Sequence, residues 1–312
     1  MIDIIGKRKW YFLISALVIL PGIAAMVYSL ITYGTPLRLS VDFTSGTIIE
    51  LQFQKPVPPA EVRAVYLEHG YADTAVQSVG DGSTVLIRSK QLDDATKQAI
   101  EAELQQKLGP ATELRYQSVG PAVGREVTRA ATIAVVVGAL AILAFIVIAF
   151  RGVPNALRYG VCAIIAMVHD ILVTVGVFAI FSLFLGWEAD ALFLTALLTM
   201  IGFSVQDTIV VFDRIRENVP KMRGEPFEVV VNRSLSQTLH RSLAIELSSL
   251  TVLTAILLLG GATMKQFVAV LIVGMITGAY SSIFNAVPLL VVWENGEVRG
   301  LFRRLRGKPA AA

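Results

Sequence analysis

A small set of titratable side chains lies inside apolar stretches of this sequence that are long enough to be membrane helices. Asp207 follows Gln206 in one such stretch, and His169 and Asp170 lie near the middle of another. A carboxylate within a membrane span costs roughly 2.5–3.5 kcal/mol on insertion scales, so a functional role is the default expectation. A desolvated carboxyl group takes up a proton when it has no partner and releases it beside a cation, which is the chemistry of a proton carrier. We therefore take Asp207 as the leading candidate proton site.

Arg241 is the candidate cation for this site. It begins the next apolar stretch, which returns through the membrane from the same side, so we expect Asp207 and Arg241 to lie at similar depth. His169 and Asp170 are a second candidate relay, because histidine titrates near neutral pH, although neighbouring helix positions point about 100° apart. A structural hydrogen bond between helices is the alternative for both sites. Glu246 is similarly ambiguous and ranks below them.

Other kinds of chemistry have little support in the sequence. No two histidines or cysteines have the spacing of metal ligands, and Cys162 is the only cysteine, so we predict no metal site, no cofactor and no disulfide within the chain. No glycine-rich phosphate loop is present, so we do not expect the chain to be an enzyme that hydrolyses a nucleotide. An intramembrane aspartyl protease would need Asp170 and Asp207 at one water molecule, and a neighbouring Arg241 works against the shared proton of such a site.

The composition places these residues in a polytopic membrane protein. The 312 residues are 54% hydrophobic with a mean hydropathy of +0.65, which is too apolar for an ordinary soluble chain. A helix needs about 20 residues to cross the bilayer core. The stretches that meet this requirement are Trp10–Thr32, Thr128–Phe150, Tyr159–Leu185, Ala191–Phe212, Leu243–Gly260 and Phe267–Val292.

Basic residues flank these stretches and predict the orientation of the chain. They lie before the first stretch, between the second and third, between the fourth and fifth, and after the sixth, where residues 294–312 form a basic tail. The positive-inside rule therefore places both termini in the cytoplasm, and the clusters are expected to face membrane lipid rather than nucleic acid. The first apolar run is longer than that of a usual signal peptide, so we expect residues 1–32 to be retained as a cytoplasmic start and an anchor.

Residues 33–127 have the character of a small soluble domain outside the cytoplasm. Leu37–Gln54 is predicted to be a strand, with apolar and polar residues alternating at its end. A short helix, two strands joined at a glycine-rich turn, an amphipathic helix and a last strand follow, which is the β-α-β-β-α-β order of a ferredoxin-like domain. His69 at the end of the first helix has no second histidine or cysteine nearby and is interpreted as a solvated loop residue.

Residues 128–293 are predicted to form a five-helix transmembrane bundle. Gly274, Gly278 and Ser282 recur at four-residue spacing on the last helix, which permits close packing against a neighbour. The intervening segment 214–242 is expected in the cytoplasm, with an amphipathic helix lying along the inner membrane surface. Its first charged residues are interpreted mainly as the solvated exit of the Asp207 helix; they are Asp213, Arg214 and Arg216.

Several motifs in these segments resemble the SecD/SecF family of protein-export membrane proteins, and within it the SecF branch. The resemblance covers nearly the whole chain, and the most specific motifs are IGFSVQDTIVVFDRIREN at 201–218 and NRSLSQTLHRS at 232–242. The other motifs are VDFTSGT at 41–47, SVGPAVGRE at 118–126, HD at 169–170 and GAYSSIFNAVPL at 278–289.

This resemblance implies half of a twelve-span transporter of the resistance-nodulation-division type, paired with SecD beside the SecYEG channel. In that family protons flowing down the proton-motive force drive the movement of an unfolded polypeptide across the cytoplasmic membrane of a prokaryote. By motif match, Asp207 and Arg241 carry the proton path. Two further classes of function remain open from the residues alone: half of an exporter of small molecules or lipids, and a passive assembly scaffold.

Two positions depart from the family pattern. A Gly-Gly pair usually stands where this chain has Ser45 and Gly46, and we expect that change to disturb a turn only slightly. A small residue usually stands at the position of His240, which here places a titratable group beside Arg241.

Overall fold

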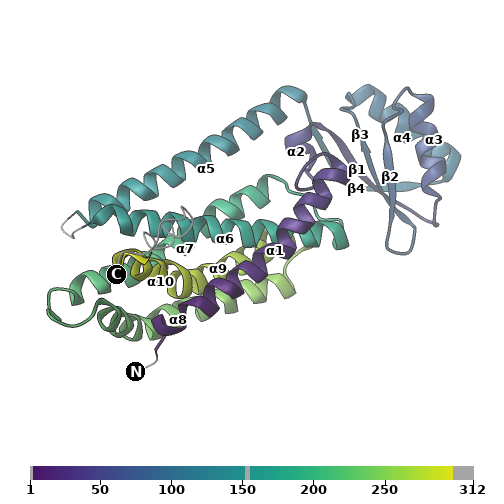
Figure 1. The fold of residues 1–312 in the computed structure, drawn as a ribbon. Coiled ribbons are helices and arrows are strands. Elements are labelled where there is room, and N and C mark those ends of the chain that lie inside the picture. Colours follow the sequence, from purple (N-terminus) through teal and green to yellow (C-terminus); the bar gives the residue numbers. More distant parts are fainter. Residues whose placement is uncertain (1–2, 152–154, 298–312) are drawn as a thin grey trace. The chain divides into compact units, whose positions relative to one another are not determined.

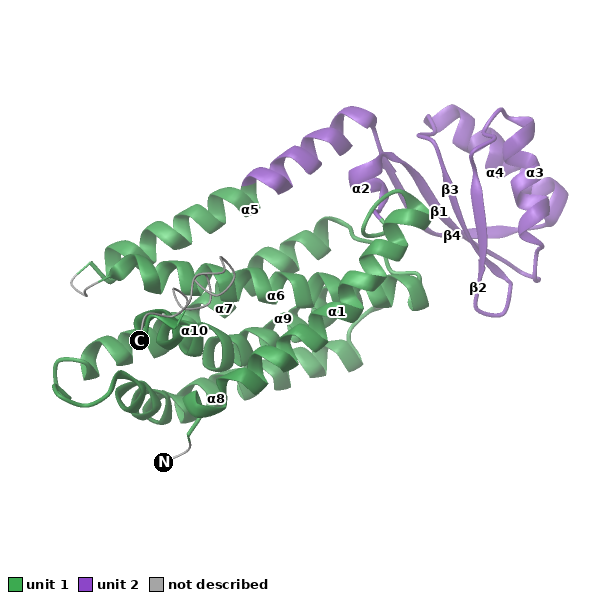
Figure 2. Ribbon diagram, viewed as in Figure 1, with its two compact units in different colours: residues 1–38, 134–312 green, residues 39–133 purple. Residues whose placement is uncertain are grey.

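The protein divides into two compact units, a helical unit and an α/β unit (Figure 2). The structure, a computed structural model, describes residues 3–151 and 155–297. The helical unit takes residues 1–38 and 134–312, and the α/β unit takes residues 39–133.

The described helices include six that are long and apolar enough to cross a membrane, as predicted. Four of these spans are single α-helices (Figure 1). The first, Ile5–Tyr33, begins with a short 3₁₀ turn, and the last, Met264–Glu294, is divided by a short π-helical turn. The elements are the 3₁₀ turn η1 (Ile5–Lys7), α1 (Arg8–Tyr33), α5 (Pro121–Ala149), α6 (Ala156–Leu185), α7 (Ala191–Asn218), α8 (Phe227–Leu259), α9 (Ala262–Ser281), η2 (Ser282–Ala286) and α10 (Val287–Glu294).

The predicted separate amphipathic helix is instead the first part of α8. We expected that helix to lie along the inner membrane surface ahead of a span beginning at Leu243, but α8 runs without interruption from Phe227 to Leu259. No glycine or proline occurs between these two residues, so nothing in the sequence stops the backbone hydrogen-bond ladder. At about 1.5 Å per residue the 33 residues of α8 span about 50 Å, more than a bilayer core requires.

Glycines bring two pairs of helices into close contact. A Cβ atom at Gly274 would lie 2.6 Å from Met200 Cβ, and one at Gly278 would lie 3.0 Å from the Ser204 Cα, so α9 packs closely on α7 at both positions. Ser282, the third residue of the predicted stripe, is buried at the start of η2 and donates a hydrogen bond to the Ala279 carbonyl.

The second close approach was not predicted from the sequence. A Cβ at Gly22 on α1 would lie 2.6 Å from the Gly176 Cα on α6, and a Cβ at Gly176 would lie 2.8 Å from the Gly22 Cα. Neither glycine has a second small residue four positions away, which is the spacing that usually signals such contacts.

The α/β unit contains an antiparallel four-stranded sheet covered on one face by two helices. The strand order is β2-β3-β1-β4, which is compatible with the predicted ferredoxin-like domain. Its elements are α2 (Val41–Thr44), β1 (Gly46–Phe53), α3 (Pro59–Glu68), β2 (Ala75–Val79), β3 (Thr84–Ser89), α4 (Asp94–Leu108) and β4 (Ala111–Val119). The core joins alternate residues of the central strands to one face of each helix; its members include Ile49, Leu51, Val62, Tyr66, Val85, Ile87, Ile100 and Leu104.

Two local predictions for this unit were wrong. The first strand begins at Gly46, not at Leu37, because Val41–Thr44 forms a helical turn in which the Ser45 N–H donates to the Val41 carbonyl. His69 lies in the turn that ends α3, as expected, but it is not a freely solvated residue, because its side chain is three-quarters buried and its Nε2 lies 2.7 Å from Glu103 Oε2. Proximity in the fold supplies a partner that lies 34 residues away in the chain.

Ser45 holds a backbone conformation that favours glycine. Its φ is 63° and its ψ is 165°, a region that is essentially reserved for glycine and that strains other residues by about 1–3 kcal/mol. The neighbouring Gly46 also has a positive φ, and a Cβ there would lie 2.6 Å from the Ser89 carbonyl oxygen. The departure at Ser45 therefore disturbs the turn more than we expected from the sequence.

Replacing Ser45 with glycine is expected to stabilise the α/β unit by about 1 kcal/mol, because relief of strain exceeds the added freedom of the unfolded chain. The measurement is amide hydrogen exchange of β1 in the full-length protein, where Ser45→Gly should slow exchange. Ser45→Ala is the control, since it keeps the Cβ that causes the strain. Equal exchange in the two variants would contradict this assignment.

Candidate functional site

Asp170 is the centre of a buried polar cluster formed by three helices. Its side chain on α6 is fully buried, and its Oδ2 accepts hydrogen bonds from Ser204 Oγ on α7 at 2.5 Å and from Ser281 Oγ on α9 at 2.6 Å. Its Oδ1 lies 2.9 Å from His169 Nδ1. One carboxyl group thus links α6, α7 and α9 inside the part of the fold that is long and apolar enough to span a membrane.

His169 connects this cluster to a small cavity between helices. Its ring stacks near Tyr280, with 6.3 Å between the ring centroids, and its Nε2 is buried without a hydrogen-bond partner. The cavity has a volume of about 200 Å³ and lies among α1, α6 and α9. Ser15 and Thr277 supply hydroxyl groups to its lining. Although His169 and Asp170 are adjacent in sequence, the side chains turn toward each other, so they are one unit in this structure.

Asp207 lies one helical turn beyond Ser204 on the same face of α7. Its side chain is 7% exposed, and its Oδ2 is buried without a hydrogen-bond partner. The side chain within hydrogen-bonding range of the Asp207 carboxyl group is Glu246 on α8, which is 8% exposed and also has a buried oxygen without a partner. The α7–α8 contact therefore brings two carboxyl groups together.

The expected pairing of Asp207 with Arg241 is absent, because the antiparallel register of α7 and α8 places Arg241 at another level. Arg214 Nε donates a hydrogen bond to Gln237 Oε1 at 2.6 Å, and Asn218 Nδ2 donates one to Ser234 Oγ at 2.8 Å. Continued along both helices, this register sets Asp207 opposite Glu246. Arg241 lies five residues before Glu246 on α8, which places it about 7.5 Å nearer than Glu246 to the α7–α8 connection.

Arg241 lines an open cavity of about 260 Å³ at this level, between α7 and α8. Asp213, Arg214 and Glu217 line the same cavity. The interpretation of the charged end of α7 as a solvated helix exit is confirmed, since Arg216 pairs with Asp213 at 2.8 Å and Arg214 pairs with Glu217 at 2.7 Å among well-exposed side chains. Arg241 and His240 are both exposed.

Comparison with known proteins assigns this arrangement to a family. Residues 99–296 match the model described as "Protein export membrane protein SecD/SecF, C-terminal", and residues 31–57 match the SecD/SecF GG motif. The chain belongs to the SecD/SecF family. Two similar relatives are named protein translocase subunit SecF: that of Anaerolinea thermophila is 48% identical and that of Thermobaculum terrenum is 46% identical, each over the full length of both chains.

Solved structures agree with this membership in the SecD/SecF family. The crystal structure of SecDF, a translocon-associated membrane protein from Thermus thermophilus, is 32% identical with a TM-score of 0.75 over 94% of this chain. SecDF in the super-membrane-facing form gives 30% identity and a TM-score of 0.65 over 97% of this chain. The chain spans about 40% of the length of the SecDF proteins it matches. It is thus a SecF-type, multi-pass subunit of the Sec protein translocation machinery in the cytoplasmic membrane.

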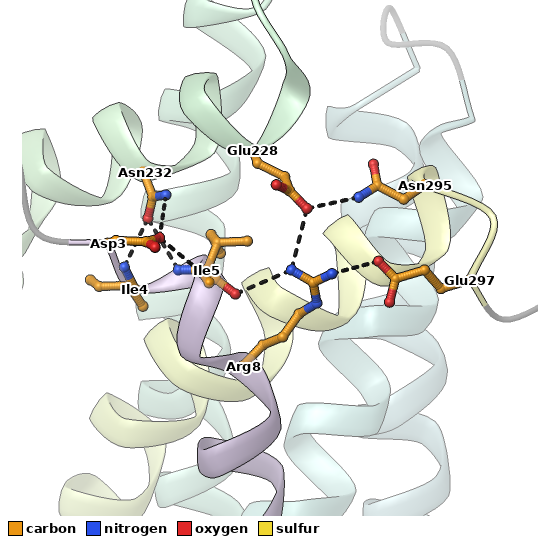
Figure 3. Close-up of polar contacts among 9 residues, drawn as sticks. Asp3, Ile4, Ile5, Arg8, Glu228, Asn232, Asn295 and Glu297 are labelled. Carbon is orange, nitrogen blue, oxygen red and sulfur yellow. Dashed lines mark hydrogen bonds and ion pairs between the residues drawn. The ribbon is translucent and has the colours of Figure 1, made fainter.

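The NRSLSQTLHRS motif of this SecD/SecF member has a structural role at its start. Asn232 Oδ1 accepts hydrogen bonds from the backbone N–H groups of Ile4 and Ile5, at 3.1 and 3.2 Å, and its Nδ2 donates to Asp3 (Figure 3). Beside it, Arg8 at the start of α1 pairs with Glu228 at the start of α8 and with Glu297 after α10 (Figure 3). These contacts, which we call the N-terminal clamp, hold the starts of α1 and α8 and the end of α10 together.

Sequence reasoning missed the hydroxyl groups of the SecD/SecF site and undervalued Glu246. Ser204 and Ser281 are small polar residues of a kind that apolar helices often contain, so only the positions of the helices show that both donate to Asp170. Ser204 stands three residues before Asp207, a spacing that puts both on one helix face and was a usable signal. The buried Asn285 in η2, whose Oδ1 accepts from Ser15, belongs to the π-helical turn, a feature often found at functional sites.

Proposed function

We propose that this chain acts with SecD beside the SecYEG channel and uses the proton-motive force to promote the export of unfolded polypeptides. The observation that carries the proposal is the pair of buried acidic sites in adjacent membrane helices. Asp170 and Asp207 lie on α6 and α7, and Ser204 connects them, since it bonds to Asp170 and lies one turn from Asp207. Ionisable groups that are buried at membrane depth in transporters characteristically mark proton relays.

The available energy suits such a role. One proton crossing about 100 mV supplies about 2.3 kcal/mol. That free energy changes the ratio of two conformations by a factor of about 50, which is enough to bias a domain movement. It is too small to unfold a stable protein, so the substrate of the proposed function is a polypeptide that is already unfolded.

The N-terminal clamp supports the proposed orientation. Arg8, Glu228 and Glu297 gather the beginning of the chain, the start of α8 and the end of the last described helix at one end of the helical unit. Arg158 at the start of α6 joins the same end, because it pairs with Glu294 at 2.8 Å. We place this basic end in the cytoplasm, which puts the α/β unit outside it, where an exported polypeptide emerges.

The test compares Asp207→Asn with Asp213→Asn in vesicles that contain SecD and the channel. Both variants remove one carboxylate from α7, but Asp213 is an exposed residue paired with Arg216. Export stimulation by an imposed proton gradient should fall to the level of vesicles without the chain for Asp207→Asn and remain normal for Asp213→Asn. Normal stimulation in the first variant, with intact SecD association, would instead favour a passive scaffold.

A further inference from the structure

Glu246 occupies the position beside Asp207 where a cation was expected. Both side chains are more than nine-tenths buried, and their carboxyl groups are within hydrogen-bonding range across the α7–α8 contact. Asp207 Oδ2 and Glu246 Oε2 are each buried without a donor from the part of the chain that the structure describes. Among residues 3–151 and 155–297, no positively charged side chain pairs with either carboxyl group to compensate a double negative charge.

Two carboxyl groups in such a place hold a proton together. Two adjacent carboxylates repel each other strongly where water is excluded, and a proton placed between them removes one charge and supplies the missing hydrogen bond. The pair then binds and releases protons as a unit, and neither residue can be assigned the proton alone.

The surrounding helices offer few other groups that could take over this role. Arg241 on α8 is five residues away and exposed, and Asp213 and Arg214 on α7 line the same outer cavity as Arg241. On α6, Asp170 and His169 already bond to each other. The titratable side chain in the middle of α9 is Tyr280, whose hydroxyl donates to the Tyr11 carbonyl.

We propose that Asp207 and Glu246 form one proton-binding unit, with Glu246 as a second proton-carrying residue of the transport cycle. The pair with one shared proton carries a single negative charge. Release of that proton gives two carboxylates, a state that requires Arg241 or water to approach from the cavity at the α7–α8 connection. Uptake of one proton from the opposite side restores the starting state, so one proton moves per cycle and no other reactant is consumed.

This inference rests on the proposed function, and a separate variant tests it. Glu246→Gln keeps the shape of the side chain and removes the repulsion that holds the shared proton. Asp207 then holds its proton less tightly, so the pH midpoint of export stimulation should fall by about one unit or more. Glu217→Gln, a change of the same type at an exposed position of the neighbouring cavity, is the control and should leave the midpoint unchanged.

A spectroscopic readout on the assembled complex follows the proton itself. Infrared difference spectra recorded near neutral pH should show a protonated carboxyl band in the wild type that both Asp207→Asn and Glu246→Gln remove, with SecD association measured for each variant.

An unchanged pH midpoint and band in Glu246→Gln, together with lost stimulation in Asp207→Asn, would overturn the shared-proton pair and leave the proposed function standing. Normal stimulation in Asp207→Asn would overturn the proposed function. Because the band is first recorded in the wild type, its absence there would contradict the pair even if a variant failed to assemble.

Discussion

Gly22→Ile is expected to separate α1 from the rest of the helical unit and to lower the thermal stability of the protein sharply. The two backbones meet at Gly22 and Gly176, where a Cβ at either position would lie within 3 Å of the other residue's Cα. A backbone atom cannot turn aside as a side chain can, so the helices must move apart and lose packing along their contact. Overpacking of this kind lowers the free energy of unfolding by about 1–3 kcal/mol, and by more where neighbouring atoms cannot move out of the way.

The measurement is the melting temperature of the detergent-solubilised protein, followed by size-exclusion chromatography after heating. Gly138→Ile is the matched control, because a Cβ at Gly138 on α5 meets nothing within 4 Å. A melting temperature for Gly22→Ile equal to that of Gly138→Ile would show that α1 and α6 do not make this contact.

Asp170→Ala is the second change with a large expected effect. The carboxyl group accepts hydrogen bonds from Ser204 and Ser281 and contacts His169, so its loss leaves three polar groups without their buried acceptor. Hydrogen bonds to a charged group contribute about 1.5–3 kcal/mol each when measured by removal of one partner. Hydrogen bonds between membrane helices are weaker and contribute about 0.6 kcal/mol on average. The serine hydroxyls can also donate to carbonyls of their own helices. We therefore expect Asp170→Ala to lower the free energy of unfolding by about 2 kcal/mol in total.

Asp170→Asn separates the hydrogen-bonding role from the charge. The amide keeps the volume and one acceptor oxygen, so stability should decrease in the order wild type, Asp170→Asn, Asp170→Ala. Unfolding by denaturant in mixed micelles gives this order, and Asp213→Ala supplies an exposed carboxylate as reference. Identical unfolding free energies for the three proteins would refute a role of Asp170 in joining α6, α7 and α9.

Much of the fold follows from periodicity in the sequence. The six spans, the order of the strands and helices in the α/β unit, and the burial of Asp170 and Asp207 were expected from local patterns and are present. Features that depend on how two distant segments align were not predictable in the same way. The partner of Asp207 is one example: a shift of five residues along α8 exchanges Arg241 for Glu246, and hydrophobic patterning does not set the register of two helices that closely.

Backbone conformation and close approach are the other sources of error. The departure from a Gly-Gly pair marks Ser45 in the sequence, but the extent of its strain becomes visible only in the structure, where the chain enters β1 from the α2 turn. The Gly22–Gly176 contact likewise joins two glycines that are 154 residues apart and have no motif around them. The continuity of α8 could have been inferred, because the absence of a helix breaker was visible in the sequence.

Proton flow and polypeptide export, measured together in the same vesicles, test the central claim most directly. For the wild type, proton uptake should rise when an export substrate is present, and export should rise with the imposed proton gradient. For Asp207→Asn both responses should disappear while SecD remains associated. Substrate-dependent proton flow that persists in Asp207→Asn, or export that still responds to the gradient, would contradict a proton path through Asp207.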